Sequence, residues 1–260
     1  IYIVFFITCV ILFTGLQTKS IEGMDEHSAM YISKNPFPKV NVTPRLVLTY
    51  KTLDVVPNRV MERFKKNSNG FNLHFFDDIQ CTQFLNQHYG VNVLTKYTSL
   101  NSKAHKADLF RYCYLYKFGG IYLDIKCVLY KQLKDIFEPD VITTCLSISP
   151  NTIFQAIIAI PPHHPVMKRC IHKILHTDNS DYNKNYLLIT RQMYSILNES
   201  YEMKYGHNTS KNEGMPLELL KEVKTSSCMT GKKDRYNLCI EVHSKRIGPV
   251  LYARDPEYPY

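Results

Sequence analysis

One short stretch of the chain gathers charged side chains at a spacing that could do chemistry. Asp108 and Arg111 are three residues apart, so a helix would place them on the same side. Gly119 and Gly120 follow, and Asp124 comes after a short apolar run. Because a Gly-Gly turn lets the chain fold back beside the helix, Asp124 can approach the same pocket. The sequence therefore predicts that two carboxylates and a guanidinium meet at one point.

Side chains of these types suit the transfer of a sugar from a nucleoside diphosphate. Carboxylates can hold ribose and sugar hydroxyls or a divalent metal, and cations can neutralise the departing diphosphate. Lys106 and Lys126 add positive charge beside the carboxylates. Taken alone, Asp108 and Arg111 would be an ordinary surface ion pair on a helix. The Gly-Gly-x-Tyr-x-Asp pattern that follows them favours a functional site.

Two elements must position these residues. Residues 103–118 carry apolar or aromatic side chains at every third or fourth place, which predicts a helix that buries one face and ends at the two glycines. Residues 121–123 predict a short strand with Asp124 at its carboxyl end. Tyrosines alternate along the helix, so we expect them to pack in the core rather than to stack on a base.

The surrounding sequence alternates between strand patterns and helix patterns. This alternation predicts an α/β fold with a mostly parallel central sheet flanked by helices. In such a sheet the ligand sits beyond the carboxyl ends of the strands. We expect Asp77-Asp78 and His163-His164 to lie at helix starts, as caps or loop residues. The expected strands are 45–50, 72–76, 141–148 and 153–160, and the expected helices are 57–66, 79–88, 165–176 and 186–198.

The central stretch resembles the glycosyltransferases with a DXD-containing sugar-binding region, of the glycosyltransferase family 32 type. That family includes yeast α-1,6-mannosyltransferase and, more distantly, the large clostridial glucosylating toxins. The core that carries the resemblance consists of Lys106-Ala107-Asp108, Arg111-Tyr112 and residues 116–124, which read YKFGGIYLD. Weaker similarity covers residues 43–49, 75–78 and 151–165.

The resemblance implies a GT-A-like, single Rossmann-like domain and a role for each matching residue. Asp108 would hold donor sugar or ribose hydroxyls, and Arg111 would contact the sugar or the diphosphate. Asp124 would be the first acid of the DXD motif and would touch the ribose and a Mn²⁺ or Mg²⁺ ion. The donor would be a UDP- or GDP-sugar, and the acceptor a glycan, a lipid or a protein. The donor-binding set implied in this way is Asp108, Arg111, Gly119, Gly120, Tyr122, Asp124 and Lys126.

The third position of the DXD motif departs from the family pattern, because it is Lys126. A lysine cannot coordinate a divalent metal. In one hypothesis its ammonium replaces the metal as the neutraliser of the diphosphate; in a second, Asp124 binds the metal with a distal residue such as His243 or Asp255. In a third, catalysis is lost and a pseudo-glycosyltransferase that binds a nucleotide sugar or a glycan is left. Strand alternation would also place Lys126 on the same face as Asp124, as an ion-pair partner.

The N-terminus points to the secretory pathway. Residues 1–16 form an uncharged apolar run, slightly short of the roughly 20 residues that span a bilayer. The run is either a signal anchor that stays or the core of a signal peptide that is cleaved, and we expect the anchor because no small-x-small cleavage site follows. Residues 17–40 would then form a stem, and residues 41–260 a catalytic domain in the lumen of the Golgi or endoplasmic reticulum.

Acceptor triplets for N-glycosylation and the cysteines agree with that compartment. The triplets begin at Asn41, Asn198 and Asn208. Cys228 and Cys239 flank a polar loop and are the best candidates for a disulfide. We expect the other cysteines beyond the N-terminal run to be buried thiols, namely Cys81, Cys113, Cys127, Cys145 and Cys170.

The formal net charge of +9, from 32 Lys and Arg against 23 Asp and Glu, should attract anions. Nucleoside diphosphates, acidic glycans and lipid headgroups are all anions that such a charge would attract. We expect no nucleic-acid partner, because the N-terminus is apolar and no aromatic and basic platform is present in the sequence.

Overall fold

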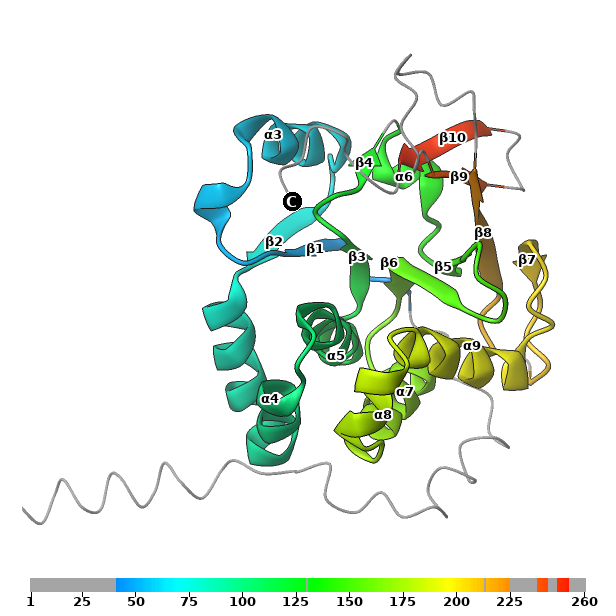
Figure 1. Cartoon of the computed structure of the whole chain (residues 1–260). Coiled ribbons are helices and arrows are strands. Elements are labelled where there is room, and N and C mark those ends of the chain that lie inside the picture. The colour runs from blue at the N-terminus through cyan, green and yellow to red at the C-terminus, as the bar shows by residue number, and fades with distance from the viewer. Residues whose placement is uncertain (1–40, 130, 213, 225–237, 243–246, 253–260) are drawn as a thin grey trace, which may run out of the picture.

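A ten-stranded mixed sheet carries helices on both faces (Figure 1). The computed structural model describes residues 41–129, 131–212, 214–224, 238–242 and 247–252. The strands are β1 (Arg45–Thr49), β2 (Asn72–Phe76), β3 (Gly120–Leu123), β4 (Val128–Leu129), β5 (Ile142–Leu146), β6 (Ile153–Ile160), β7 (Gly206–Asn208), β8 (Leu217–Lys224), β9 (Leu238–Val242) and β10 (Ile247–Tyr252). The helices are η1 (Leu53–Val55), α3 (Asn58–Asn67), α4 (Asp78–Ser99), α5 (Lys103–Phe118), α6 (Leu133–Ile136), α7 (Pro165–Leu175), α8 (Asn179–Lys184) and α9 (Leu188–Ser200).

The strands lie in the order β2-β1-β3-β6-β5-β8-β9-β10-β4, and β7 pairs with β8. Helices α4, α5, α7, α8 and α9 pack on one face and build one hydrophobic core with it. Helices α3 and α6 pack on the other face around a second core. The expected α/β fold with flanking helices is therefore confirmed.

The expectation of a mostly parallel sheet is wrong. Among the described strands, three of the nine pairings are parallel, namely β1 with β2, β1 with β3 and β5 with β8. Strand β6 runs antiparallel to both β3 and β5. The physical reason is the short connection of residues 147–152 between β5 and β6, because a parallel crossover needs about a dozen residues or more.

Several predicted helix ends are confirmed. Helix α5 has the predicted bounds. Asp77 caps α4 with a capping box, in which its carboxylate accepts from the Gln80 backbone and the Gln80 side chain accepts from the Asp77 backbone. His164 caps α7 by accepting from the Val166 backbone at 3.3 Å. Helix α4 runs past its predicted end at residue 88, with a break at Gly90, where φ is 74°.

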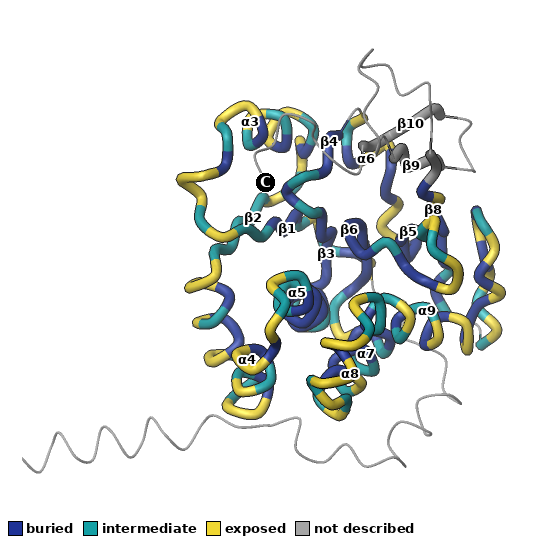
Figure 2. Tube along the Cα trace, in the orientation of Figure 1, coloured by how far each residue is buried: buried dark blue, intermediate teal, exposed yellow. Residues whose placement is uncertain are grey.

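Helix α5 is the most enclosed helix near the site. Residues 108–115 are all buried, so the helix buries its whole circumference there rather than the single face that the spacing predicts (Figure 2). Tyr112 and Tyr114 lie in the core, as expected. A helix that is buried all round must satisfy any charge it carries within the protein.

Two glycines turn the chain from α5 into β3. Gly119 closes the helix by donating its N–H to the Leu115 carbonyl at 2.8 Å. Gly119 and Gly120 both have positive φ, at 63° and 110°. A Cβ on Gly119 would stand 2.5 Å from the Pro162 nitrogen, and one on Gly120 would stand 2.7 Å from the Arg45 carbonyl oxygen. The turn therefore brings β3 against its neighbours only because both side chains are absent.

The three glycosylation triplets differ in accessibility. Asn41 and Asn198 are exposed. Asn208 is 5% exposed, and its side-chain nitrogen donates to the carbonyls of Lys204 and Gly206. A glycan on Asn208 would have to replace these bonds, so the triplet at Asn208 is the least accessible of the three in the folded chain.

Some expectations fall outside the described residues. These are the apolar run 1–16, the stem 17–40, the Cys228 to Cys239 disulfide and the candidate metal ligands His243 and Asp255. In the described part of the chain, no helix combines the length and hydropathy needed to cross a membrane. The five cysteines expected to be buried thiols are free and buried.

Gly120→Ala should destabilise the fold more than Gly70→Ala. Both positions have positive φ, but a Cβ at Gly70 meets nothing within 4 Å. Backbone strain alone should cost roughly 1 to 3 kcal/mol in either variant, and the clash with Arg45 should add roughly 1 to 3 kcal/mol at Gly120. Urea unfolding of the two variants measures the difference, and equal losses would contradict the close approach.

Candidate functional site

Asp108, Arg111 and Asp124 meet at the carboxyl end of β3. The Arg111 Nη2 atom lies 3.3 Å from an Asp108 oxygen and 3.4 Å from an Asp124 oxygen. Asp108 and Arg111 are buried, whereas the Asp124 side chain is 40% exposed. The predicted convergence of these residues, which we name the acid–arginine cluster, is confirmed. The simple surface ion pair is excluded, because the pair is buried.

The Arg111 guanidinium is held by groups from three elements. Its Nε donates to the Ala107 carbonyl at 3.2 Å, and its Nη1 donates to the Gln155 carbonyl on β6 at 2.5 Å. Its Nη2 faces Asp108 and Asp124. A guanidinium has five N–H donors, and here each of its nitrogens already has a partner in the protein. Arg111 therefore fixes the two carboxylates in place and is itself turned away from solvent.

Tyr122 orients Asp124 through a hydrogen bond. Its hydroxyl donates to the Asp124 Oδ1 at 2.8 Å, and the Thr49 hydroxyl lies 3.1 Å from the same phenol oxygen. Because the single phenol proton is given to the carboxylate, Thr49 is the donor in the second bond. The Arg111 guanidinium lies 4.2 Å from the centre of the Tyr122 ring. Tyr122 is 1% exposed, so it supports Asp124 rather than facing solvent.

Burial raises the pKa of Asp108 to about 6, because desolvation outweighs the attraction of Arg111, and Asp124 raises it further. A carboxyl group with such a pKa can exchange a proton near neutral pH. A perturbed carboxyl group beside a second carboxylate is typical of functional sites, although structural ion-pair networks produce the same effect.

Lys126 lies in a turn that follows β3. The strand ends at Leu123, and the Cys127 N–H then donates to the Asp124 carbonyl at 2.9 Å, which closes a turn over residues 124–127. Lys126 is half-buried there. The expectation that Asp124 and Lys126 share one strand face is therefore wrong, because strand geometry stops before both of them.

The described donor set does not fit a divalent metal. Among the described residues, no three His, Cys, Asp or Glu side chains come together in a way that could hold an ion. Asp124 directs its Oδ1 to Tyr122 and Arg111, and the third DXD position is Lys126. The possible ligand His243 lies outside the described residues. The chemistry that the described site offers is therefore that of its own side chains.

Three further residues border the cluster and were missed in the sequence, namely Gln155, His105 and Tyr186. Gln155 is 4% exposed, and its Oε1 has no hydrogen-bond partner. Its signal was a single polar residue inside the apolar strand IFQAIIAI. His105 and Tyr186 meet beyond Asp108, and no local pattern links them.

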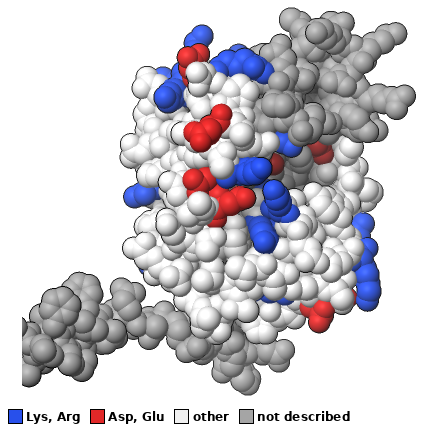
Figure 3. Space-filling model, turned by 60° about the vertical axis from the view of Figure 1, so that its left-hand side comes forward, with Lys and Arg blue, Asp and Glu red and all other residues white. Residues whose placement is uncertain are grey.

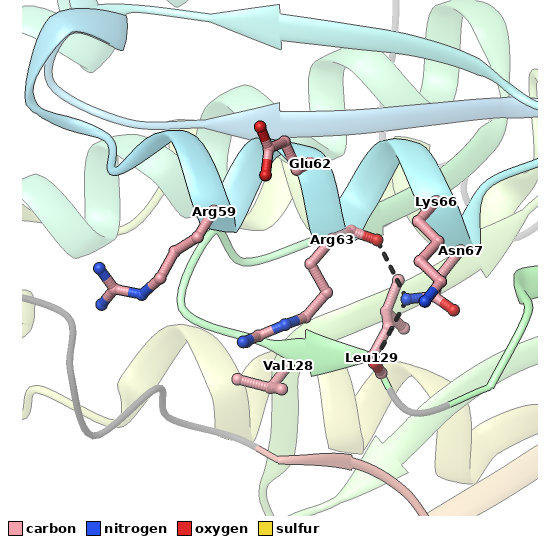
Figure 4. A pocket seen from close by; sticks show the side chains of 7 residues that line it. All are labelled: Arg59, Glu62, Arg63, Lys66, Asn67, Val128 and Leu129. Atoms are coloured by element: carbon pink, nitrogen blue, oxygen red, sulfur yellow. Dashed lines mark hydrogen bonds between the residues drawn. The ribbon is translucent and has the colours of Figure 1, made fainter.

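A separate hollow of about 430 Å³ runs along α3 and is lined by Arg59, Glu62, Arg63, Lys66, Asn67, Val128 and Leu129 (Figure 4). Three cations against one carboxylate would suit an anionic group. The hollow includes neither Asp108 nor Asp124, so we place the candidate site at the acid–arginine cluster. On the face shown in Figure 3, basic and acidic side chains lie close together rather than in one basic patch.

Comparison with known proteins identifies similar chains. Residues 45–143 match the family model described as the glycosyltransferase sugar-binding region containing a DXD motif. Over 119 residues the chain is 29% identical to an uncharacterized glycosyltransferase of Acanthamoeba polyphaga mimivirus. This alignment covers 45% of this chain and 47% of the viral protein, so the chain spans about half the length of that relative. Among solved structures, the PaToxG glycosyltransferase is similar with a TM-score of 0.44 and 16% identity, over 66% of this chain and 76% of that one.

The stability of the unmodified chain should fall as the pH rises, and Asp108→Asn should abolish this dependence. Because the pKa of Asp108 is raised from 3.8 to about 6, the folded state binds the proton more tightly than the unfolded state. Below a pH of about 4 the Asp108 carboxyl group is protonated in both the folded and the unfolded state. Above a pH of about 6 it is ionised in both states, and the full cost of burying its charge is present. The free energy of unfolding should therefore fall as the pH rises from about 4 to about 6, by at most roughly 3 kcal/mol.

Urea unfolding at a series of pH values measures this slope. The exposed Asp140→Asn is the matched control and should keep the slope of the unmodified chain. A slope that persists in Asp108→Asn would show that another group causes it.

Proposed function

We propose that this chain, whose residues 45–143 belong to the sugar-binding region of the DXD-containing glycosyltransferases, transfers a hexose or related sugar from a nucleoside-diphosphate sugar to a hydroxyl group of a glycan, lipid or protein. The acid–arginine cluster at the carboxyl end of β3 is the observation that carries the proposal. It offers one buried and one partly exposed carboxylate at the sheet edge where α/β folds bind their ligands.

In the proposed reaction, an acceptor hydroxyl attacks the anomeric carbon, the bond from that carbon to the diphosphate oxygen breaks, and the hydroxyl proton passes to the departing diphosphate or to water. Asp124 is exposed enough to accept from hydroxyls of the ribose or the sugar. Asp108 lies deeper and would accept from a sugar hydroxyl. Arg111 is assigned a positioning role, because its nitrogens are occupied by protein groups. This role differs from the direct contact with the sugar or the diphosphate that the family resemblance implies.

Lys126 is assigned to the departing nucleoside diphosphate. Its backbone lies in the turn that follows Asp124, two residues along the chain from the carboxylate that would hold the donor, and this supports the assignment. A cation there stabilises the negative charge that develops on the leaving oxygen. Of the three hypotheses for Lys126, we therefore propose the one in which its ammonium takes over the neutralising task of a metal.

The inactive alternative, a domain that only binds a nucleotide sugar or a glycan, is less well supported. It was motivated by Lys126 alone. The cluster around Arg111 keeps Asp108 buried at a cost in stability, and a perturbed carboxyl group of this kind is typical of functional sites.

The finer assignments belong to the same proposal. They are a GT-A-like domain over residues 41–260, the glycosyltransferase family 32 type, a UDP- or GDP-sugar donor, and a type II membrane protein whose domain faces the lumen of the Golgi or endoplasmic reticulum. The exposed Asn41 and Asn198 are compatible with that compartment.

Asp124→Asn should lower turnover by roughly 100-fold or more, because the amide loses the negative charge that orders the donor. Nucleotide release from a panel of UDP- and GDP-sugars measures turnover, and the exposed Asp140→Asn should keep full activity. Unchanged turnover in Asp124→Asn would refute the assignment of this site. Absence of turnover by the unmodified chain with every donor would instead favour the inactive alternative.

Turnover should persist when divalent metals are removed. In excess EDTA the unmodified chain should keep its rate, and Lys126→Ala should lose roughly 10- to 100-fold, because the leaving diphosphate loses its cation. Lys126→Arg is the charge-conserving control and should retain most of the rate. Lys126→Asp restores the acidic third position and should make turnover depend on Mn²⁺. Loss of activity in the unmodified chain with EDTA would support the metal hypothesis instead.

A further inference from the structure

Tyr186 presents an aromatic ring to solvent close to the acid–arginine cluster. The residue is 63% exposed and lies in the loop between α8 and α9. Among the exposed large hydrophobic residues of the described chain, it is the one aromatic ring. The loop is fixed where it enters α9, because the Leu188 N–H donates to the Asn185 carbonyl at 3.0 Å.

The ring is held from behind by His105. The His105 Nε2 lies 2.9 Å from the Tyr186 carbonyl, and since a carbonyl only accepts, this nitrogen carries the proton. The two rings lie 5.3 Å apart at an angle of 33°. His105 is 3% exposed, and its other neighbour is the buried Tyr182 ring at 5.6 Å. Tyr186 is therefore exposed on one side and supported on the other.

The position of His105 on α5 places this ring relative to the carboxylates. His105 precedes Asp108 by three residues and Arg111 by six, so it lies about 9 Å from Arg111 along the helix axis. Partial loss of hydration raises the pKa of Tyr186, and the charges of Asp108 and Asp124 raise it further. The phenol therefore lies within the electrostatic field of the cluster.

The groups form a series from one end of the site to the other. Lys126 lies in the turn beside Asp124, Arg111 joins Asp124 to Asp108, and His105 and Tyr186 follow beyond Asp108. In the proposed function the diphosphate lies at the Lys126 end and the transferred sugar lies over the two carboxylates. The molecule that receives the sugar must then approach from the remaining end, where Tyr186 stands.

We propose that Tyr186 is a binding platform for the acceptor, which carries a pyranose ring. The apolar C–H face of a pyranose packs on an aromatic ring, while its hydroxyl groups stay hydrated. A ring backed by His105 is already in place before the acceptor arrives, so little conformational entropy is lost on binding. This inference rests on the proposed function and adds the class of acceptor to it.

The test separates the acceptor from the donor. Tyr186→Ala should raise the acceptor KM roughly 3- to 10-fold, which is the range expected for loss of one stacking contact. The donor KM and the rate of donor hydrolysis by water should stay within about twofold of the unmodified chain. Tyr186→Phe, which keeps the ring, should behave like the unmodified chain. Val91→Ala, at a position that is 70% exposed on α4, is the control for removal of an exposed apolar side chain.

The acceptor probes are the methyl pyranosides of glucose, galactose, mannose and N-acetylglucosamine. Their binding is also followed by saturation-transfer NMR, which needs no turnover and should detect contacts between an aromatic ring and the sugar C–H groups. A raised donor KM with an unchanged acceptor KM would overturn the inference and indicate stacking on the donor base. Donor hydrolysis without binding or use of any pyranoside would also overturn it, while the proposed function would stand. Pyranoside binding without donor turnover would refute the proposed function alone.

Discussion

The Arg111 guanidinium is held almost entirely out of water, and its charge must be balanced inside the protein. Burial alone would lower the pKa of Arg111, but Tyr122, Asp124 and Asp108 together raise it, so the positive charge is kept. Leaving a buried charge without any partner typically costs about 3 to 5 kcal/mol, so the two carboxylates together balance the Arg111 guanidinium. Helix α5, the residues after β3 and strand β6 each supply a group to this side chain, so it sets their mutual placement.

The parts of the site with a local pattern could be predicted from the sequence. The bounds of α5, the pairing of Asp108 with Arg111 and the return of Asp124 follow from helix periodicity and the Gly-Gly turn. The β5 to β6 hairpin was also readable, because its connection is too short for a crossover. Tyr186 was not, since its bond to His105 joins residues 81 apart and long-range contacts leave no local spacing.

The family match and the site overlap only in part. Residues 45–143 include Asp108, Arg111 and Asp124, but the match ends before Gln155 and Tyr186. The residues that would hold the donor therefore lie within the region that matches the glycosyltransferase family model. Tyr186, at the end where an acceptor would enter, comes from a later segment, the loop before α9, and it packs on His105 of the matched region.

Asp124 makes both of its side-chain contacts through one oxygen. Its Oδ1 accepts from Tyr122 and faces Arg111, and these two contacts fix the rotation of the carboxylate. The second oxygen is thereby aimed in one direction rather than sweeping through many. In stereochemical terms, a fixed acceptor of this kind distinguishes a hydroxyl on one face of a sugar ring from its epimer on the other. A carboxylate free to rotate would accept from both.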